Sequence, residues 1–187
     1  MRIAFLADTY PPENRGGAGV VVERLATSFV AAGHDVQVIA TTPGVARVGV
    51  DEGVTVHRLR SRYPERFRNT VAMFNPMVVT GVRAALQEFS PDVVHAHNVH
   101  QHLSFEALGI AAGTGVPVLY TAHDYLLFCC IKFICTNGSV DFRQRWFNCA
   151  KCQRFRWNPA RNEVIRKHMT NDVDHLFAIS KTLQVAL

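Results

Sequence analysis

Residues 2–40 read RIAFLADTYPPENRGGAGVVVERLATSFVAAGHDVQVIA, and this stretch decides the fold. Residues 2–7 form a short apolar run of the kind that makes a buried strand. Apolar residues at helical spacing follow over 20–32, and Gly33 stands where a helix end favours a positive φ. Residues 36–40 form a second apolar run. Strand, glycine-rich loop, helix and strand in this order predict a βαβ unit with parallel strands.

The same alternation continues along the chain. Further strands are predicted over 54–59, 92–97, 116–121 and 175–179, and further helices over 75–89, 104–112 and 158–170. Two of these helices begin with Asn-Pro, a cap residue followed by proline. Because crossovers in such chains are right-handed, the pattern predicts an α/β, Rossmann-like doubly wound parallel sheet in the strand order 3-2-1-4-5-6. Ligands of such sheets bind beyond the carboxyl ends of the strands, at the switch between strands 1 and 4.

Composition supports one folded domain over residues 1–187, with 48% hydrophobic and 19% charged residues. The apolar run at residues 2–7 is shorter than a signal peptide needs, and no run of about 18 apolar residues occurs, so we expect a cytoplasmic protein. The net charge of +5 is concentrated in residues 141–170, which hold eight Lys or Arg residues against two acidic residues. A second basic stretch covers residues 58–68. Such runs indicate either a solvated face or a surface for an anionic partner.

The glycine-rich loop contains Gly16, Gly17 and Gly19. Glycines let the backbone approach a ligand closely, and the helix start that follows favours an anion. A dinucleotide fingerprint needs a third glycine where Val22 stands, and an acidic residue after the second strand, where residues 40–43 read ATTP. A nicotinamide cofactor is therefore disfavoured. The remaining hypotheses are a loop that contacts a diphosphate or sugar, and a tight turn with no ligand.

Polar residues gather at two later strand ends. The fourth strand ends in HAHNVHQH over residues 95–102, which includes His97 and Asn98, and the fifth is followed by His123 and Asp124. Histidines at this spacing could hold a metal, but no carboxylate accompanies them closely, so a polar ligand pocket is favoured. Asp124 could orient His123 or bind a hydroxyl group of a ligand. Alternatively, the two could form a buried hydrogen-bonded pair with a structural role only.

Four segments in this order resemble the N-terminal domain of retaining GT-B glycosyltransferases of family 4. They are PPENRGGAG at 11–19, AAGHDV at 31–36, PDVVHAHN at 91–98 and VPVLYTAHDY at 116–125. The resemblance covers nearly the whole chain. It implies that residues 1–187 are the acceptor-side half of a GT-B enzyme, without the C-terminal donor-binding domain, and therefore inactive alone.

The resemblance also implies a function for the individual residues. Such an enzyme transfers a sugar from a nucleotide-sugar to a glycan or lipid-linked acceptor, with no cofactor required for catalysis and no nucleic acid partner. His123 would be the catalytic residue beside the reacting sugar, and His97 and Asn98 would line the substrate pocket. Asp124 is predicted to bind substrate there from its position beside His123. The loop of Gly16, Gly17 and Gly19 would approach the donor diphosphate. A lipid-linked acceptor would bring the protein to the inner face of the membrane as a peripheral protein.

A cysteine-rich, basic and aromatic insertion is predicted over residues 128–157, after the fifth strand. Cys129, Cys135, Cys149 and Cys152 could close a structural zinc site, because the last two have the spacing of a zinc knuckle. Free thiols, a disulfide or an iron–sulfur site are the alternatives. Two other functions remain open: a zinc-stabilised nucleic-acid-binding module built on this basic loop, and a dinucleotide-dependent oxidoreductase domain.

Overall fold

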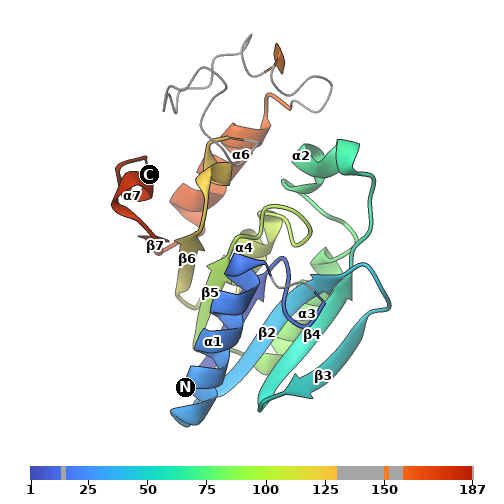
Figure 1. Ribbon diagram of the computed structural model, residues 1–187, viewed down its shortest axis with the longest axis vertical. Coiled ribbons are helices and arrows are strands. Elements are labelled where there is room, and N and C mark those ends of the chain that lie inside the picture. The colour runs from blue at the N-terminus through green and yellow to red at the C-terminus, as the bar shows by residue number, and fades with distance from the viewer. Residues whose placement is uncertain (14–15, 130–149, 152–157, 187) are drawn as a thin grey trace.

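A computed structural model describes residues 1–13, 16–129, 150–151 and 158–186 (Figure 1). Its centre is a seven-stranded sheet in the order β3-β4-β2-β1-β5-β6-β7. The strands are β1 (Arg2–Ala7), β2 (Asp35–Thr42), β3 (Arg47–Asp51), β4 (Val54–Arg60), β5 (Val93–His97), β6 (Val118–Ala122) and β7 (His175–Ala178). The helices are α1 (Gly17–Ala31), α2 (Arg68–Val71), α3 (Val79–Phe89), α4 (Glu106–Ala112), α6 (Arg161–Asn171) and α7 (Lys181–Ala186), with 3-10 turns η1 (Glu65–Phe67) and η2 (Tyr125–Leu127).

The predicted α/β class and the predicted order of the six parallel strands are confirmed. The structure adds a seventh strand that the sequence pattern did not predict, β3, which lies at one edge and pairs antiparallel with β4. Glu52 and Gly53 join these strands, both with positive φ, which suits a tight hairpin. The valines of β3 are exposed, so the strand lacks the buried alternation by which the other strands are recognised.

Helices cover both faces of the sheet and bury one core on each (Figure 1). On one face α1 packs Val22 and Ala26 in a cluster with Phe5. On the other face, residues of α3, α4 and α6 pack in a cluster that includes Leu86 and Leu108. The six parallel strands are thereby held as a rigid support for the loops at their ends.

Two predicted helix starts were wrong by a few residues. Asn75 and Asn158 each accept a hydrogen bond through the side chain from the amide two residues later, at 3.1 and 3.0 Å. Each bond closes a turn, and the helix itself begins only after that turn. Most of the predicted insertion over 128–157 lies outside the described residues.

Candidate functional site

The candidate site lies where β1, β5 and β6 end side by side at one edge of the sheet (Figure 1). The register sets Ala7 of β1 level with His97 of β5, and His97 level with Thr121 of β6. The chain segments that follow these positions therefore meet at this carboxyl edge. This is the switch point at which doubly wound sheets bind ligands.

His97 and His123, predicted in separate motifs, share a hydrogen bond. His97 Nδ1 lies 2.9 Å from His123 Nε2. Burial and the neighbouring His95 and His123 lower the pKa of His97 to about 2, and burial lowers the pKa of His123 despite the nearby Asp124. Both rings are therefore neutral at pH 7. The pair can form hydrogen bonds with a polar ligand, but it carries no positive charge with which to hold an anion.

Asn98 and Asp124 also join the two loops that follow β5 and β6. Asn98 has a φ of 45° and donates through Nδ2 to Asp124 Oδ2 at 3.2 Å. Its Oδ1 accepts from the amide of His123, also at 3.2 Å. The other oxygen of Asp124 accepts from the amide of Leu126 at 2.9 Å. The structure thus places Asp124 against Asn98 and the η2 turn, and Asn98 fixes the backbone at His123.

The glycine-rich loop starts α1 at the same edge of the sheet (Figure 1). Gly16 is the N-cap residue in an extended conformation, and Gly17 is exposed with open space around its α-carbon. Gly19 is buried, and a side chain there would place Cβ 2.8 Å from the carbonyl oxygen of Thr9. Gly17 is therefore the position open to a ligand, whereas Gly19 lets α1 pack against the preceding loop.

Asp8 is a residue of this candidate site that the motifs did not reveal. Its carboxylate accepts hydrogen bonds from three successive amides, of Gln101, His102 and Leu103, at 2.7–2.8 Å. Burial raises the pKa of Asp8 to about 6, while these amides act in the opposite direction. We call this arrangement the Asp8 clamp. An acidic residue directly after the first strand, at the switch point, is the sequence signal that could have predicted it.

The loop of residues 98–103 is also held from its other side. Tyr63 Oη donates to the carbonyl of Gln101 at 2.7 Å, and Ser61 Oγ lies 2.9 Å from His102 Nδ1. Asn75 Nδ2 donates to Ser61 Oγ at 3.0 Å and to the carbonyl of His102. The backbone that leads from the strand carrying His97 is therefore fixed between β1 and the segment after β4.

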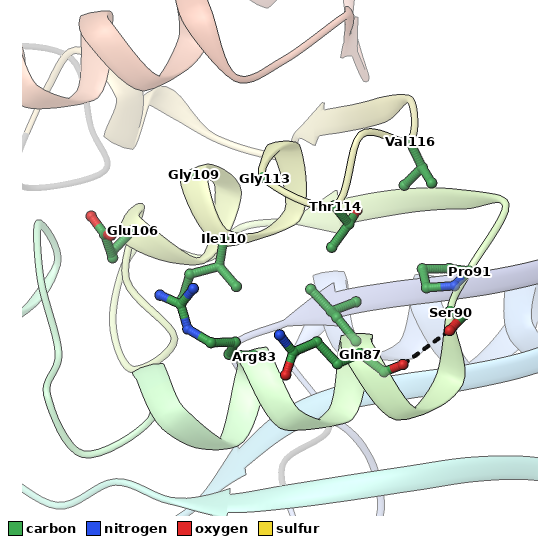
Figure 2. Close-up of a pocket in the computed structure, with 11 residues that line it drawn as sticks. Arg83, Gln87, Ser90, Pro91, Glu106, Gly109, Ile110, Gly113, Thr114 and Val116 are labelled. Carbon is green, nitrogen blue, oxygen red and sulfur yellow. Dashed lines mark hydrogen bonds between the residues drawn. The ribbon is translucent and has the colours of Figure 1, made fainter.

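A hollow of about 530 Å³ lies elsewhere, between α3 and α4 (Figure 2). It contains none of the predicted site residues; its lining is Arg83, Leu86, Gln87, Ser90, Pro91, Glu106, Gly109, Ile110, Gly113, Thr114 and Val116. Pro91 and Val116 precede the amino ends of β5 and β6, so the hollow reaches towards the opposite edge of the sheet.

The predicted zinc site cannot be placed in this geometry. Of its four cysteines only Cys129 belongs to the described residues, with a free thiol, while Cys135, Cys149 and Cys152 lie outside them. Within the described residues, no group of three or more His, Cys, Asp or Glu side chains is arranged to hold a metal ion. None of the helices in the same parts of the chain combines the length and the apolar composition that a bilayer crossing needs.

Comparisons with known proteins point to one family. The family model described as "Glycosyl transferase 4-like domain" matches residues 16–186. Glycogen synthase from two strains of Mycobacterium tuberculosis is 33% identical in an alignment 140 residues long that covers 66% of this chain and 33% of the relative. The chain thus spans about a third of the length of the curated relatives it matches.

Two solved structures resemble the fold more distantly. The Anabaena protein HepE, solved in complex with UDP and glucose, has a TM-score of 0.49 at 15% identity, over 98% of this chain and 39% of its own. A Serratia marcescens short-chain dehydrogenase/reductase variant has a TM-score of 0.38 at 10% identity, over 95% of both chains.

Proposed function

This chain belongs to the glycosyl transferase 4-like domain family, and we propose that it forms the acceptor-binding half of a retaining GT-B glycosyltransferase. The enzyme would transfer a sugar from a nucleotide-sugar to a hydroxyl group of a glycan or lipid-linked acceptor. The observation that carries the proposal is the neutral pair of His97 and His123 at the carboxyl edge, within the part of the chain that the family model matches.

A neutral imidazole suits a sugar hydroxyl, because an uncharged ring nitrogen can form a hydrogen bond with the uncharged hydroxyl group. We assign this contact to His123, which is half-buried, whereas His97 is 1% exposed. The exposed start of α1 at Gly17 is the place for the donor diphosphate, since helix-start amides and the helix dipole favour an anion. Glycine at this position leaves the backbone open to close approach.

The carboxylates of this edge are already engaged. Asp8 accepts from three amides, and Asp124 from Asn98 and Leu126. A base that deprotonates the acceptor would need a free carboxylate or imidazole nitrogen directed at it. We therefore assign these two residues to support of the site, and we propose no side-chain base among the described residues.

The whole enzyme would have a second α/β domain that holds most of the nucleotide-sugar, as the resemblance implies. This division places the acceptor and the transferred sugar against the carboxyl edge described above. Activity is accordingly expected of the protein encoded by the full reading frame. The name of the curated relatives suggests glucosyl donors as the first to be tried.

The test is sugar transfer by that full protein with UDP-glucose, ADP-glucose and GDP-mannose. We expect transfer from one donor, and we expect His123→Ala to lower kcat/KM by about 10²- to 10³-fold, as the loss of one polar contact in the transition state does. His175→Ala is the control, because His175 is exposed on β7. No transfer from any nucleotide-sugar, or full activity of His123→Ala, would refute the proposal.

We further propose that the protein contacts an anionic bilayer through the segment of residues 62–77. Phe67, Phe74 and Met77 are 45–51% exposed there. Two arginines of the segment are also exposed, Arg62 just before η1 and Arg66 within it. Exposed apolar side chains among cations suit a bilayer interface. Sedimentation with phosphatidylglycerol vesicles, but not with phosphatidylcholine vesicles, is the expected result, and Phe74→Asp should reduce it. Val48→Asp, at the exposed β3 edge, should leave it unchanged.

A structural zinc ion on Cys129, Cys135, Cys149 and Cys152 remains a proposal from their spacing. Metal analysis of the purified chain checks it. About one zinc per chain is expected, and a metal-free, fully folded protein would contradict it.

A further inference from the structure

His97 is a buried residue between His123 and the core. Its ring is 1% exposed, with the ring of His95 centred 4.2 Å away and that of Phe5 5.9 Å away. Its Nδ1 faces His123 Nε2, whereas its Nε2 is fully buried and has no hydrogen-bond partner among the residues that the structure describes. A ring so enclosed acts on a ligand only through His123.

The unpartnered nitrogen decides how the pair shares its protons. Each neutral ring has one N–H group, and the bond between His97 Nδ1 and His123 Nε2 needs one donor. If His123 Nε2 donated, the proton of His97 would sit on Nε2, as a buried N–H group without an acceptor. If His97 Nδ1 donates, Nε2 is left as an unprotonated nitrogen. Buried donors without partners are rarer than buried acceptors without partners.

We propose that His97 is a positioning residue that donates from Nδ1 to His123 Nε2 and thereby holds His123 in the tautomer protonated at Nδ1. The nitrogen of a histidine that carries the proton is set by the hydrogen bond that the other nitrogen makes. The burial that keeps both rings neutral is consistent with this arrangement.

The ligand would then meet a hydrogen-bond donor at His123. An N–H group binds a lone pair of a hydroxyl or ring oxygen, and it cannot remove a proton from the acceptor. This consequence rests on the proposed function, because it takes the ligand of His123 to be the transferred sugar. The tautomer itself does not depend on that function.

Long-range ¹H–¹⁵N spectra of the ¹⁵N-labelled chain at pH 7 test the tautomer directly. We expect a protonated Nδ1 and an unprotonated Nε2 for His123, with its signals assigned by their loss in His123→Gln. In His97→Phe the ring should revert to the Nε2-protonated form that predominates for histidine in water. His95→Phe is the matched control, because the Nε2 of His95 lies 2.8 Å from Thr121 Oγ1 and makes no hydrogen bond to His123. A wild-type His123 protonated at Nε2 would overturn the inference, and this result does not require the His97→Phe variant to fold.

The transfer assay on the full protein supplies the functional readout. His97→Phe should lower kcat/KM by about 10- to 100-fold, less than the loss of the His123 ring. His97→Gln, whose amide can donate to His123, should recover both the tautomer and most of the activity. Equal losses in His97→Gln and His97→Phe at equal melting temperature would contradict the positioning role. If the predicted tautomer is found but no sugar is transferred, the proposed function fails and the inference stands.

Discussion

Asp8 shows how a single carboxylate can organise the carboxyl edge of a sheet by binding the backbone of a neighbouring loop. Its side chain is buried, with 7% exposure of the residue, and its carboxylate accepts hydrogen bonds from the three successive amides of residues 101–103. Thr41, at the end of β2, adds a bond from its hydroxyl to the carbonyl of Asp8 at 2.5 Å. Thr41 lies where a dinucleotide-binding sheet needs its acidic residue, and its side chain is engaged in supporting the loop after β1.

Asp8→Asn is expected to lower the free energy of unfolding by about 1–3 kcal/mol at pH 7, the usual cost of leaving one buried donor unpaired. The amide can still accept from His102 and Leu103, but its NH₂ group would face the amide of Gln101. Urea denaturation measures the change. Asp92→Asn is the control, because Asp92 is exposed and its carboxylate accepts a hydrogen bond from the amide of Arg2 at the surface. Equal effects of the two substitutions would contradict the prediction.

The sequence allowed the members of the site to be predicted, but not their pairing. His97, Asn98, His123 and Asp124 follow adjacent strands, so their proximity is implied by strand order. Which side chain bonds to which depends on ring rotation and on the left-handed backbone of Asn98, and neither is encoded in a local pattern. Asp8 was missed because its three partners lie more than 90 residues away in the chain.

The elements with a buried face were predicted well. β1, β2, β5 and β6 are short runs of apolar residues between turn residues, and this pattern is typical of strands covered on both sides. β3 has no buried face, so its sequence lacks the apolar pattern of a strand, and the hairpin turn at Glu52 and Gly53 is the feature that indicates it. The starts of α3 and α6 were misplaced because an Asn-Pro pair can close a turn as well as begin a helix.

The first turn of α1 gives a paired prediction. Gly19→Ala should lower the free energy of unfolding by about 1–3 kcal/mol, because its Cβ would meet the backbone of Thr9. Gly17→Ala should leave stability unchanged or raise it by about 0.4–1 kcal/mol, since nothing lies within 4 Å of the added carbon. Thermal and urea denaturation compare the two.

The same pair separates packing from ligand binding. On the proposed function, Gly17→Ala should weaken sugar transfer while the fold stays intact. Normal sugar transfer by the Gly17→Ala protein would contradict the assignment of this loop to the donor site, whatever the result for Gly19→Ala.

At the scale of the whole molecule, acid should destabilise the fold. Burial, with the repulsion of His123, lowers the pKa of His95 to about 4 from 6.5, and His97 is lowered to about 2. Below pH 6.5 the unfolded chain therefore binds more protons than the folded chain, so the free energy of unfolding decreases as the pH is lowered. Lowered pKa values at His57, His102 and His123 act in the same direction.

Asp8 acts in the opposite direction, because its pKa of about 6 lies above the unfolded value of 3.8. It stabilises the fold as the pH falls from about 6 towards 3.8, but it is one group against several histidines. We expect a net loss of about 2 kcal/mol between pH 6.5 and pH 5. Urea denaturation at both pH values measures this loss, and His95→Gln should reduce it. Greater stability at pH 5 in the wild-type protein would contradict the expectation.

The Asp8 clamp also sets an order of events during synthesis on the ribosome. Asp8 emerges early, but its partner amides follow 93–95 residues later. β2 can pair with one side of β1 soon after it appears, while the side that receives β5 waits for the chain to grow through β3, β4 and α3. Closing so long a loop is slow relative to local pairing. The carboxyl edge that holds the candidate site therefore cannot be completed before the nascent chain has passed Leu103, when the three amides become available to Asp8.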